Sequence, residues 1–155
     1  MHVGTKFNSI AKSGNYKTKL NSIDTPAKLG FKMPAEWEPH AATWLTWPRP
    51  NGISFPGRYK TVPPVLSKLV KLISEGETVH INIWDKELEL LAIRSLDKEN
   101  VSLKKIHFHP FQSYEPWCRD HGPMFIVQPN GNQAIVNWGY NAWGEKYPPF
   151  NLDDS

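Results

Sequence analysis

The stretch TVHINIW, residues 78–84, alternates apolar and polar side chains along its whole length. One side of an extended chain would carry Val79, Ile81 and Ile83, and the other would carry Thr78, His80 and Asn82. This period of two is typical of a β-strand, because successive side chains of a strand point to opposite faces. The stretch therefore predicts a strand with one buried face and one more polar face.

A helix is expected on each side of this strand. Before it, Pro63 and Pro64 stand where proline is tolerated, at a helix start, and apolar residues then follow at helical spacing until Gly76. After it, Asp85 is a suitable N-cap for a helix that continues through Leu96. A strand flanked by two helices is typical of an α/β fold.

Further strands are expected on both sides of this core. The segments 41–47 and 101–111 are rich in β-branched and aromatic residues. The segments 123–128 and 133–138 flank PNGN, and Asn-Gly between two apolar runs is a strong signal for a β-hairpin. Strands and helices alternate, so the sequence predicts the α/β class.

Charge and cysteine content exclude several classes of partner. The net charge is +3, and residues 1–24 account for it, because the remainder holds 14 basic and 14 acidic residues. A neutral body gives no reason to expect nucleic acid as a partner. No apolar run has the length of a transmembrane helix, and the lone Cys118 favours a reducing, cytoplasmic setting. No phosphate-binding loop, CxxC or HExxH motif is present, so no cofactor or metal is predicted.

The polar, Lys-rich segment 1–25 is expected to be a disordered leader or the product of a mis-assigned start codon. An organelle-targeting peptide is the alternative, but the segment has no Arg and no clear amphipathic period. The ordered domain is expected to span residues 26–155.

The stretch EPWCRDHGP, residues 115–123, brings an aromatic ring and a carboxylate close together in sequence. Trp117 and Asp120 would share a pocket if the chain turned between them. Such a pair suits a planar guanidinium cation, because the carboxylate accepts two N–H donors while the ring covers the cation's face. Residue types alone favour a turn-capping Asp120 and a core Trp117 instead.

Two other chemistries are weaker candidates. Cys118 could act as a nucleophile with His121 as its base, although a buried cysteine is more often an apolar filler. His107 and His109 have the spacing that places two imidazoles on one strand face, as some metal sites require. No third ligand is evident, so hydrogen-bonded or exposed histidines are favoured there.

Three motifs in order resemble the N-terminal part of the agmatine deiminase family, which includes the bacterial type of peptidyl-arginine deiminase. They are MPAEWEPHAATWLTWP at 33–48, PWCRDHGPMFIV at 116–127 and NWGYNAWGEKYPPFNLDD at 137–154. The resemblance implies the pentein fold, a propeller of five ββαβ blades around a central active site. The chain would supply about two of these blades.

The resemblance also implies a reaction. In the family a Cys attacks the guanidinium carbon, a His moves protons, acidic residues hold the guanidinium nitrogens, ammonia leaves and water releases the product. The family motif W-x-R-D-x-G-P falls on residues 117–123, so Asp120 is expected to hold the guanidinium at the catalytic centre and Trp117 to line its pocket. Cys118 occupies the variable position and is not the expected nucleophile.

The family's nucleophilic Cys and its catalytic His have no counterpart in the 155 residues. We therefore expect an inactive fragment with half of the site, and an uncovered apolar surface over residues 138–150. The complete protein is expected to convert agmatine to N-carbamoylputrescine and ammonia in polyamine biosynthesis. Peptidyl-arginine deimination, a non-catalytic guanidinium-binding module and a structural remnant stay open as alternatives, and no oligomeric state is predicted.

Overall fold

The computed structural model describes residues 6–9 and 25–154, which form two compact units. One unit combines residues 6–9 and 25–39 with His121–Tyr140, and the other combines His40–Asp120 with residues 141–154. Both contain a three-stranded sheet. None of the helices in the described residues is long and apolar enough to cross a membrane.

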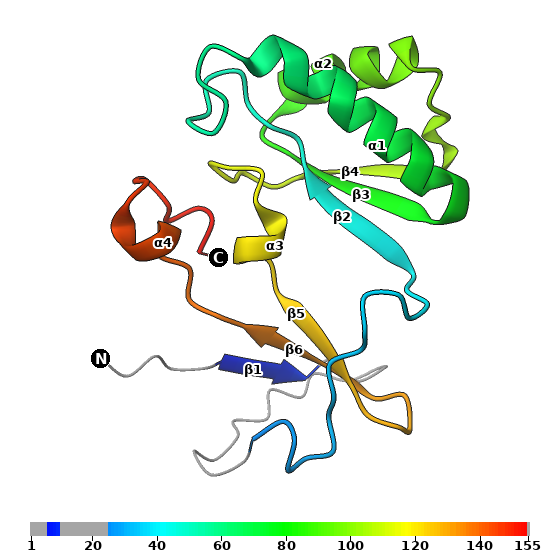
Figure 1. Ribbon diagram of the computed structural model, residues 1–155, viewed down its shortest axis with the longest axis vertical. Helices are drawn as coiled ribbons and strands as arrows, with labels where there is room; N and C mark the ends of the chain where they lie inside the picture. Colours follow the sequence, from blue (N-terminus) through cyan, green and yellow to red (C-terminus); the bar gives the residue numbers. More distant parts are fainter. Residues whose placement is uncertain (1–5, 10–24, 155) are drawn as a thin grey trace. The chain divides into compact units, whose positions relative to one another are not determined.

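The larger unit is a parallel sheet covered by helices on one face (Figure 1). Its strands are β2 (Ala42–Thr46), β3 (Thr78–Ile83) and β4 (Ile106–Pro110), with β3 in the centre. The connecting helices are α1 (Val62–Gly76) and α2 (Lys86–Lys98). Its short turns are η1 (Tyr59–Thr61), η2 (Leu103–Lys105) and α4 (Ala142–Glu145), and α3 (Cys118–His121) lies at the boundary with the other unit. The predicted α/β class is confirmed.

The alternation in residues 78–84 has the predicted consequence. Along β3 every second residue is buried, and Val79, Ile81 and Ile83 are at most 2% exposed. They form the core with residues from both helices, from β4 and from the segments that follow β2 and α2, namely Trp47, Val70, Leu88, Ala92, Leu96, Val101 and Ile106. The opposite face of the sheet carries the polar residues of β3.

The smaller unit is an antiparallel sheet in the order β1-β6-β5. Its strands are β1 (Lys6–Ser9), β5 (Met124–Val127) and β6 (Gln133–Asn137). The hairpin predicted around Asn130-Gly131 is confirmed: β5 pairs with β6, and Gly131 has a φ of 85°, which glycine adopts without strain. Apart from β1 and residue 25, the predicted leader lies outside the described residues, so that interpretation stays a prediction.

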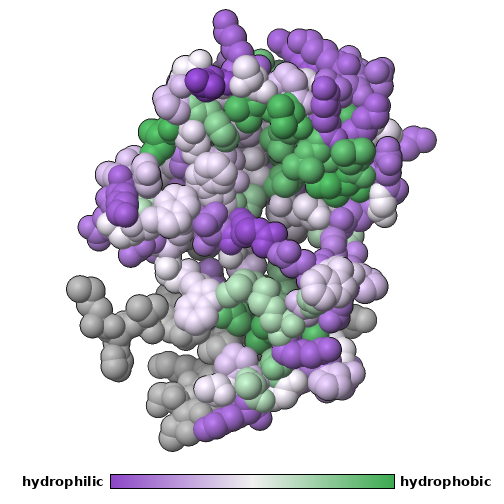
Figure 2. Space-filling view, in the orientation of Figure 1, coloured by the Kyte–Doolittle hydropathy of each residue, from purple (hydrophilic) through white to green (hydrophobic). Residues whose placement is uncertain are grey.

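Two details differ from the sequence pattern. The strand expected over 101–111 begins only at Ile106, because residues 103–105 form the η2 turn that Ser102 caps. The apolar residues of α1 are also not all in the core, since Val65, Leu69 and Leu72 lie 44–68% exposed. They contribute to the apolar patch over the helical layer in Figure 2.

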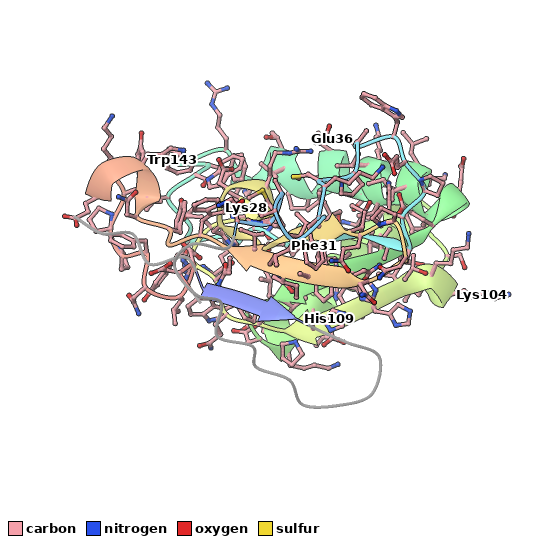
Figure 3. All side chains as sticks on the ribbon, turned by 90° about the horizontal axis from the view of Figure 1, so that it is seen from below. Lys28, Phe31, Glu36, Lys104, His109 and Trp143 are labelled. Atoms are coloured by element: carbon pink, nitrogen blue, oxygen red, sulfur yellow. The ribbon has the colours of Figure 1, made fainter. Side chains whose placement is uncertain are left out.

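The aromatic residues near the end of the chain are also exposed, as expected for residues 138–150. Trp138 in the smaller unit is 53% exposed, and Trp143 and Tyr147 in the larger unit are 46% and 52% exposed. Figure 3 labels Trp143 on α4. These rings leave apolar area in contact with solvent in the described residues.

The N-cap of α2 offers a test of the fold. Asp85 accepts a hydrogen bond from the Leu88 N–H at 2.8 Å, as the sequence predicted. We expect Asp85→Ala to lower the free energy of unfolding by about 1 kcal/mol, because one N-terminal N–H loses its partner. Asp97→Ala, an exposed position in the last turn of α2, is the matched control in urea unfolding. An equal effect of the two variants would contradict the capping role.

Candidate functional site

The candidate site is built at the edge of the parallel sheet where all three strands end. The segments that follow are 47–59 after β2, Trp84-Asp85 after β3 and 111–120 after β4. Parallel strands present their carboxyl ends at one edge, which is where α/β proteins place ligands. Most of the contacts described below connect these three segments.

Trp117 and Asp120 lie in one tight turn. The Asp120 N–H donates to the Trp117 carbonyl at 2.8 Å, so the chain turns between them as the shared-pocket hypothesis requires. Trp117 is 37% exposed rather than a core residue, and Asp120 is exposed as well. The Trp117 ring packs against Phe55, with 5.9 Å between ring centroids. Both side chains are therefore accessible to a ligand.

The Glu115 carboxylate ties two of these segments together. It is 6% exposed and accepts hydrogen bonds from the N–H groups of Ile53 at 2.9 Å and Ser54 at 3.1 Å, and from the Ser54 hydroxyl. Burial raises the pKa of Glu115, while those N–H groups and the Arg49 guanidinium oppose the rise. A buried carboxylate is tolerated because it is hydrogen-bonded.

A second buried acid fixes the backbone just before Trp117. Asp153 is 3% exposed, and its Oδ1 accepts the Tyr114 N–H at 2.6 Å and the Glu115 N–H at 3.5 Å. The Asp153 N–H in turn donates to the Phe150 carbonyl at 2.9 Å. Residues 150–154 are thereby held against residues 114–115.

Arg49 forms a third connection. Its guanidinium lies 4.2 Å from the centroid of the Trp84 ring and 5.4 Å from that of Tyr114. Its Nε and Nη2 both donate to the Tyr114 carbonyl, at 3.3 and 3.0 Å. A hollow of about 230 Å³ lies beside it, lined in part by Trp84 and Asp85. Trp117 and Asp120 do not line this hollow.

Cys118 has the surroundings of a structural thiol. Its Sγ lies 3.2 Å from Thr46 Oγ1, at the end of β2, and Thr46 also accepts a hydrogen bond from the Asn82 side chain at 3.3 Å. Burial raises the pKa of the Cys118 thiol, so the reactive thiolate is disfavoured. The ring of His121, the base considered from the sequence, packs instead edge-on against Tyr140.

The strand histidines form a stack on the open face of the sheet. His80 Nδ1 and His109 Nε2 are 2.7 Å apart, and Trp44 stacks on His80 at 4.5 Å. Burial and the neighbouring His109 and His107 lower the pKa of His80. Figure 3 shows His109 on β4 and Lys104 projecting from the preceding turn. Within residues 6–9 and 25–154, no three His, Cys, Asp or Glu side chains could hold a metal ion together.

Sequence reasoning missed three residues that shape this edge: Arg49, Glu115 and Asp153. Arg49 stood in a segment interpreted only as a loop, and Asp153 lies 38 residues after Glu115. One indication of a role was available for Glu115 in the sequence, namely its position two residues before Trp117. Its partners in the 53–54 segment are more than 60 residues away in sequence, and no local pattern predicts such contacts.

Comparison with known proteins places this geometry in a family. Residues 32–155 match the model of the Porphyromonas-type peptidyl-arginine deiminase family. The chain belongs to this family. The matched range includes residues 117–123, where W-x-R-D-x-G-P forms the turn described above.

Individual relatives of this deiminase family agree. Agmatine deiminase from Pseudomonas aeruginosa (strain LESB58) is 36% identical over 139 residues, which cover 86% of this chain and 36% of the relative. The enzyme of the same name from Pseudomonas putida is 36% identical over 140 residues, covering 87% and 35%. The chain thus spans about a third of the length of these curated relatives.

A solved structure shows the same fold. Agmatine deiminase from C. jejuni with substrate bound superposes with a TM-score of 0.62 at 20% identity, over 80% of this chain and 34% of that one. At this identity the similarity establishes the fold alone. The recognition of the family from three sequence motifs is confirmed, while the roles of Trp117 and Asp120 stay predictions.

The environment of Cys118 predicts low reactivity. We expect alkylation by iodoacetamide near neutral pH to be at least about tenfold slower than that of a free cysteine peptide, because burial raises the pKa of the thiol and so disfavours the reactive thiolate. Thr46→Val should change the rate by removing the hydrogen-bond partner, and mass spectrometry reports the modified fraction. Alkylation at the rate of the free peptide would contradict the structural role.

The raised pKa of Glu115 predicts the pH dependence of stability. The folded chain holds this proton more tightly than the unfolded chain does, so its stabilising contribution is full below the ordinary pKa of 4.5 and is lost as pH rises through the raised pKa. Relative to Glu115→Gln, which does not titrate, the wild-type chain should lose free energy of unfolding across that interval. Urea titrations at several pH values measure this, and a relative gain with rising pH would contradict the shift.

Proposed function

We propose that these residues carry the guanidinium-binding part of a deiminase that hydrolyses a C–N bond of a linear amidine. The observation that carries the proposal is that the family motif falls on the turn from Trp117 into α3, where Trp117 and Asp120 are both accessible. The complete protein would convert agmatine to N-carbamoylputrescine and ammonia.

The chemistry suits these two side chains. A carboxylate with free lone pairs accepts two parallel N–H donors from a guanidinium, which fixes the plane of the cation. An indole ring attracts the same cation through its π-face. Asp120 would therefore hold and orient the guanidinium, and Trp117 would form one wall of its site. Holding the reacting carbon in place lowers the entropic part of the barrier for attack by a nucleophile.

The nucleophile of the proposed reaction is not Cys118. Burial raises the pKa of its thiol, which disfavours the thiolate, and its Sγ is hydrogen-bonded with Thr46 Oγ1. The family resemblance assigns the attacking Cys and the proton-transferring His to motifs that these 155 residues do not contain. The chain by itself is therefore proposed to bind a guanidinium compound without releasing ammonia. Since side chains supply all of these roles, the proposed mechanism uses no cofactor.

The proposed architecture is a partial pentein propeller with about two of its five blades. The similarity in fold to the solved deiminase structures supports the pentein part of this assignment. We place the complete protein in the cytoplasm, the reducing setting that the lone Cys118 indicates.

Peptidyl-arginine is a second candidate substrate, because the matching family is described by that activity. The two substrates differ chemically: agmatine carries an amine where arginine in a peptide carries backbone amides. Comparing agmatine with an acetylated arginine amide therefore separates them. A non-catalytic guanidinium-binding module is a third candidate, and it requires saturable binding by the chain alone.

Agmatine binding by the 155-residue chain tests the proposal. We expect an affinity of about millimolar, since solvent competes for an exposed carboxylate, and at least about tenfold weaker binding by Asp120→Asn. Isothermal titration or NMR shift mapping measures both. Asp97→Asn is the control variant, and putrescine, which lacks the guanidinium, is the control ligand. Equal binding by Asp120→Asn, or no binding by the wild-type chain, would overturn the guanidinium site.

A further inference from the structure

Glu115 is a buried acid with no role in the chemistry described so far. We propose that Glu115 is a positioning residue that fixes the Trp117 ring for guanidinium binding by anchoring the loop that carries Phe55. The inference rests on the proposed function for the role of Trp117, but the contacts that carry it are independent of that function.

Glu115 holds the loop at residues 53–54 by hydrogen bonds. Two backbone N–H groups, from Ile53 and Ser54, and the Ser54 hydroxyl all donate to the same carboxylate. A Cβ at Gly52 would lie 3.3 Å from the Arg49 carbonyl oxygen, which is a tight contact, and at an ordinary contact distance of 3.5 Å from Glu115 Oε1. The loop is therefore held by one side chain at three donors.

The loop that Glu115 holds also carries Phe55, which contacts the Trp117 ring. Phe55 directly follows Ser54, and its ring packs on Trp117 with an interplanar angle of 51°. Glu115 itself lies two residues before Trp117. The carboxylate thus restrains both partners of the ring pair, one through the 53–54 backbone and the other through its own backbone. Asp153, which holds the Tyr114 and Glu115 N–H groups, fixes the point from which this restraint acts.

The energetics favour positioning over general stabilisation. Desolvation is the largest influence on Glu115 and raises its pKa, so the ionised form is a cost to the folded state. Asp153 adds to this cost through like charge. An apolar residue could fill a buried position without either penalty. What the carboxylate provides and an apolar residue cannot is a directional link to three donors.

A fixed ring matters for a weak cation site. Trp117 is partly exposed, and Phe55 is the aromatic contact that the structure shows for it. If the loop were released, the indole would gain rotamer freedom that guanidinium binding would have to remove again. Loosening the loop should therefore weaken binding even though no ligand-contacting residue has changed.

The test uses Glu115→Gln and the milder Ser54→Ala, with Glu75→Gln, at an exposed position on α1, as the matched control. Three quantities are measured near neutral pH: the nuclear Overhauser contact between the Phe55 ring and the Trp117 indole, the agmatine Kd, and the thermal unfolding midpoint. The indole signal is assigned by its loss in Trp117→Phe. We expect Glu115→Gln to lose the ring contact and bind agmatine about tenfold more weakly, with Tm unchanged or raised.

Ser54→Ala should show the same changes to a smaller extent, about threefold in Kd, because the two backbone donors stay in place. Glu75→Gln should change neither the ring contact nor the Kd. If Glu115→Gln does not fold, Ser54→Ala decides by the same measurements.

The outcomes separate this inference from the proposed function. A folded Glu115→Gln or Ser54→Ala that keeps both the ring contact and the wild-type Kd would overturn the positioning role while leaving the guanidinium site intact. If the wild-type chain binds no agmatine but Glu115→Gln loses the ring contact, the anchoring role is supported and the proposed function is overturned. A fall in Tm with an unchanged ring contact and Kd would reduce Glu115 to a structural residue.

Discussion

Parallel pairing on both sides of β3 is the constraint on which the larger unit depends. Because β2 and β4 both run in its direction, each connection must cross back over the sheet, and the helices α1 and α2 make these crossings on one face. The apolar residues of β3 are covered as a result. The same constraint brings the carboxyl ends of all three strands to one edge, where the segments carrying Arg49, Trp84 and Trp117 meet.

At that edge, charged side chains connect the segments, and two of them, Glu115 and Asp153, are buried. Glu115, Asp153 and Arg49 come from different segments, and each forms hydrogen bonds with backbone groups of another segment. Irregular segments have few intrasegment hydrogen bonds, so side-chain acceptors and donors must satisfy their backbone. This arrangement gives the carboxyl edge of the sheet a defined geometry without regular secondary structure. It also leaves Trp117 and Asp120 exposed, as a site for a ligand requires.

Membership of the deiminase family connects these features with the proposed function. The proposed guanidinium ligand would need a carboxylate and a ring in fixed relation, and Asp120 of α3 and Trp117 directly before it lie within four residues of each other. Apolar residues of α1 and the rings of Trp143 and Tyr147 are exposed. The chain spans about a third of the length of its curated relatives. The titrations of Glu115 and Cys118 concern the scaffold around the turn rather than the reacting groups.

The sequence by itself determined the family, the main strands and helices of the larger unit and the hairpin of the smaller one. The alternation of residues 78–84, the Asp85 cap and the Asn130-Gly131 turn act over a few residues, so local rules of periodicity and turn conformation suffice to predict them. The turn between Trp117 and Asp120 could also be predicted, because Gly122-Pro123 and the W-x-R-D-x-G-P spacing indicate it. Only the tertiary structure decided that the buried carboxylates of Glu115 and Asp153 accept hydrogen bonds from distant backbone N–H groups. The same holds for the hydrogen bond between the Cys118 thiol and Thr46. The partners in these hydrogen bonds lie 38 to 72 residues apart, and contacts at that separation follow from the packing of whole elements.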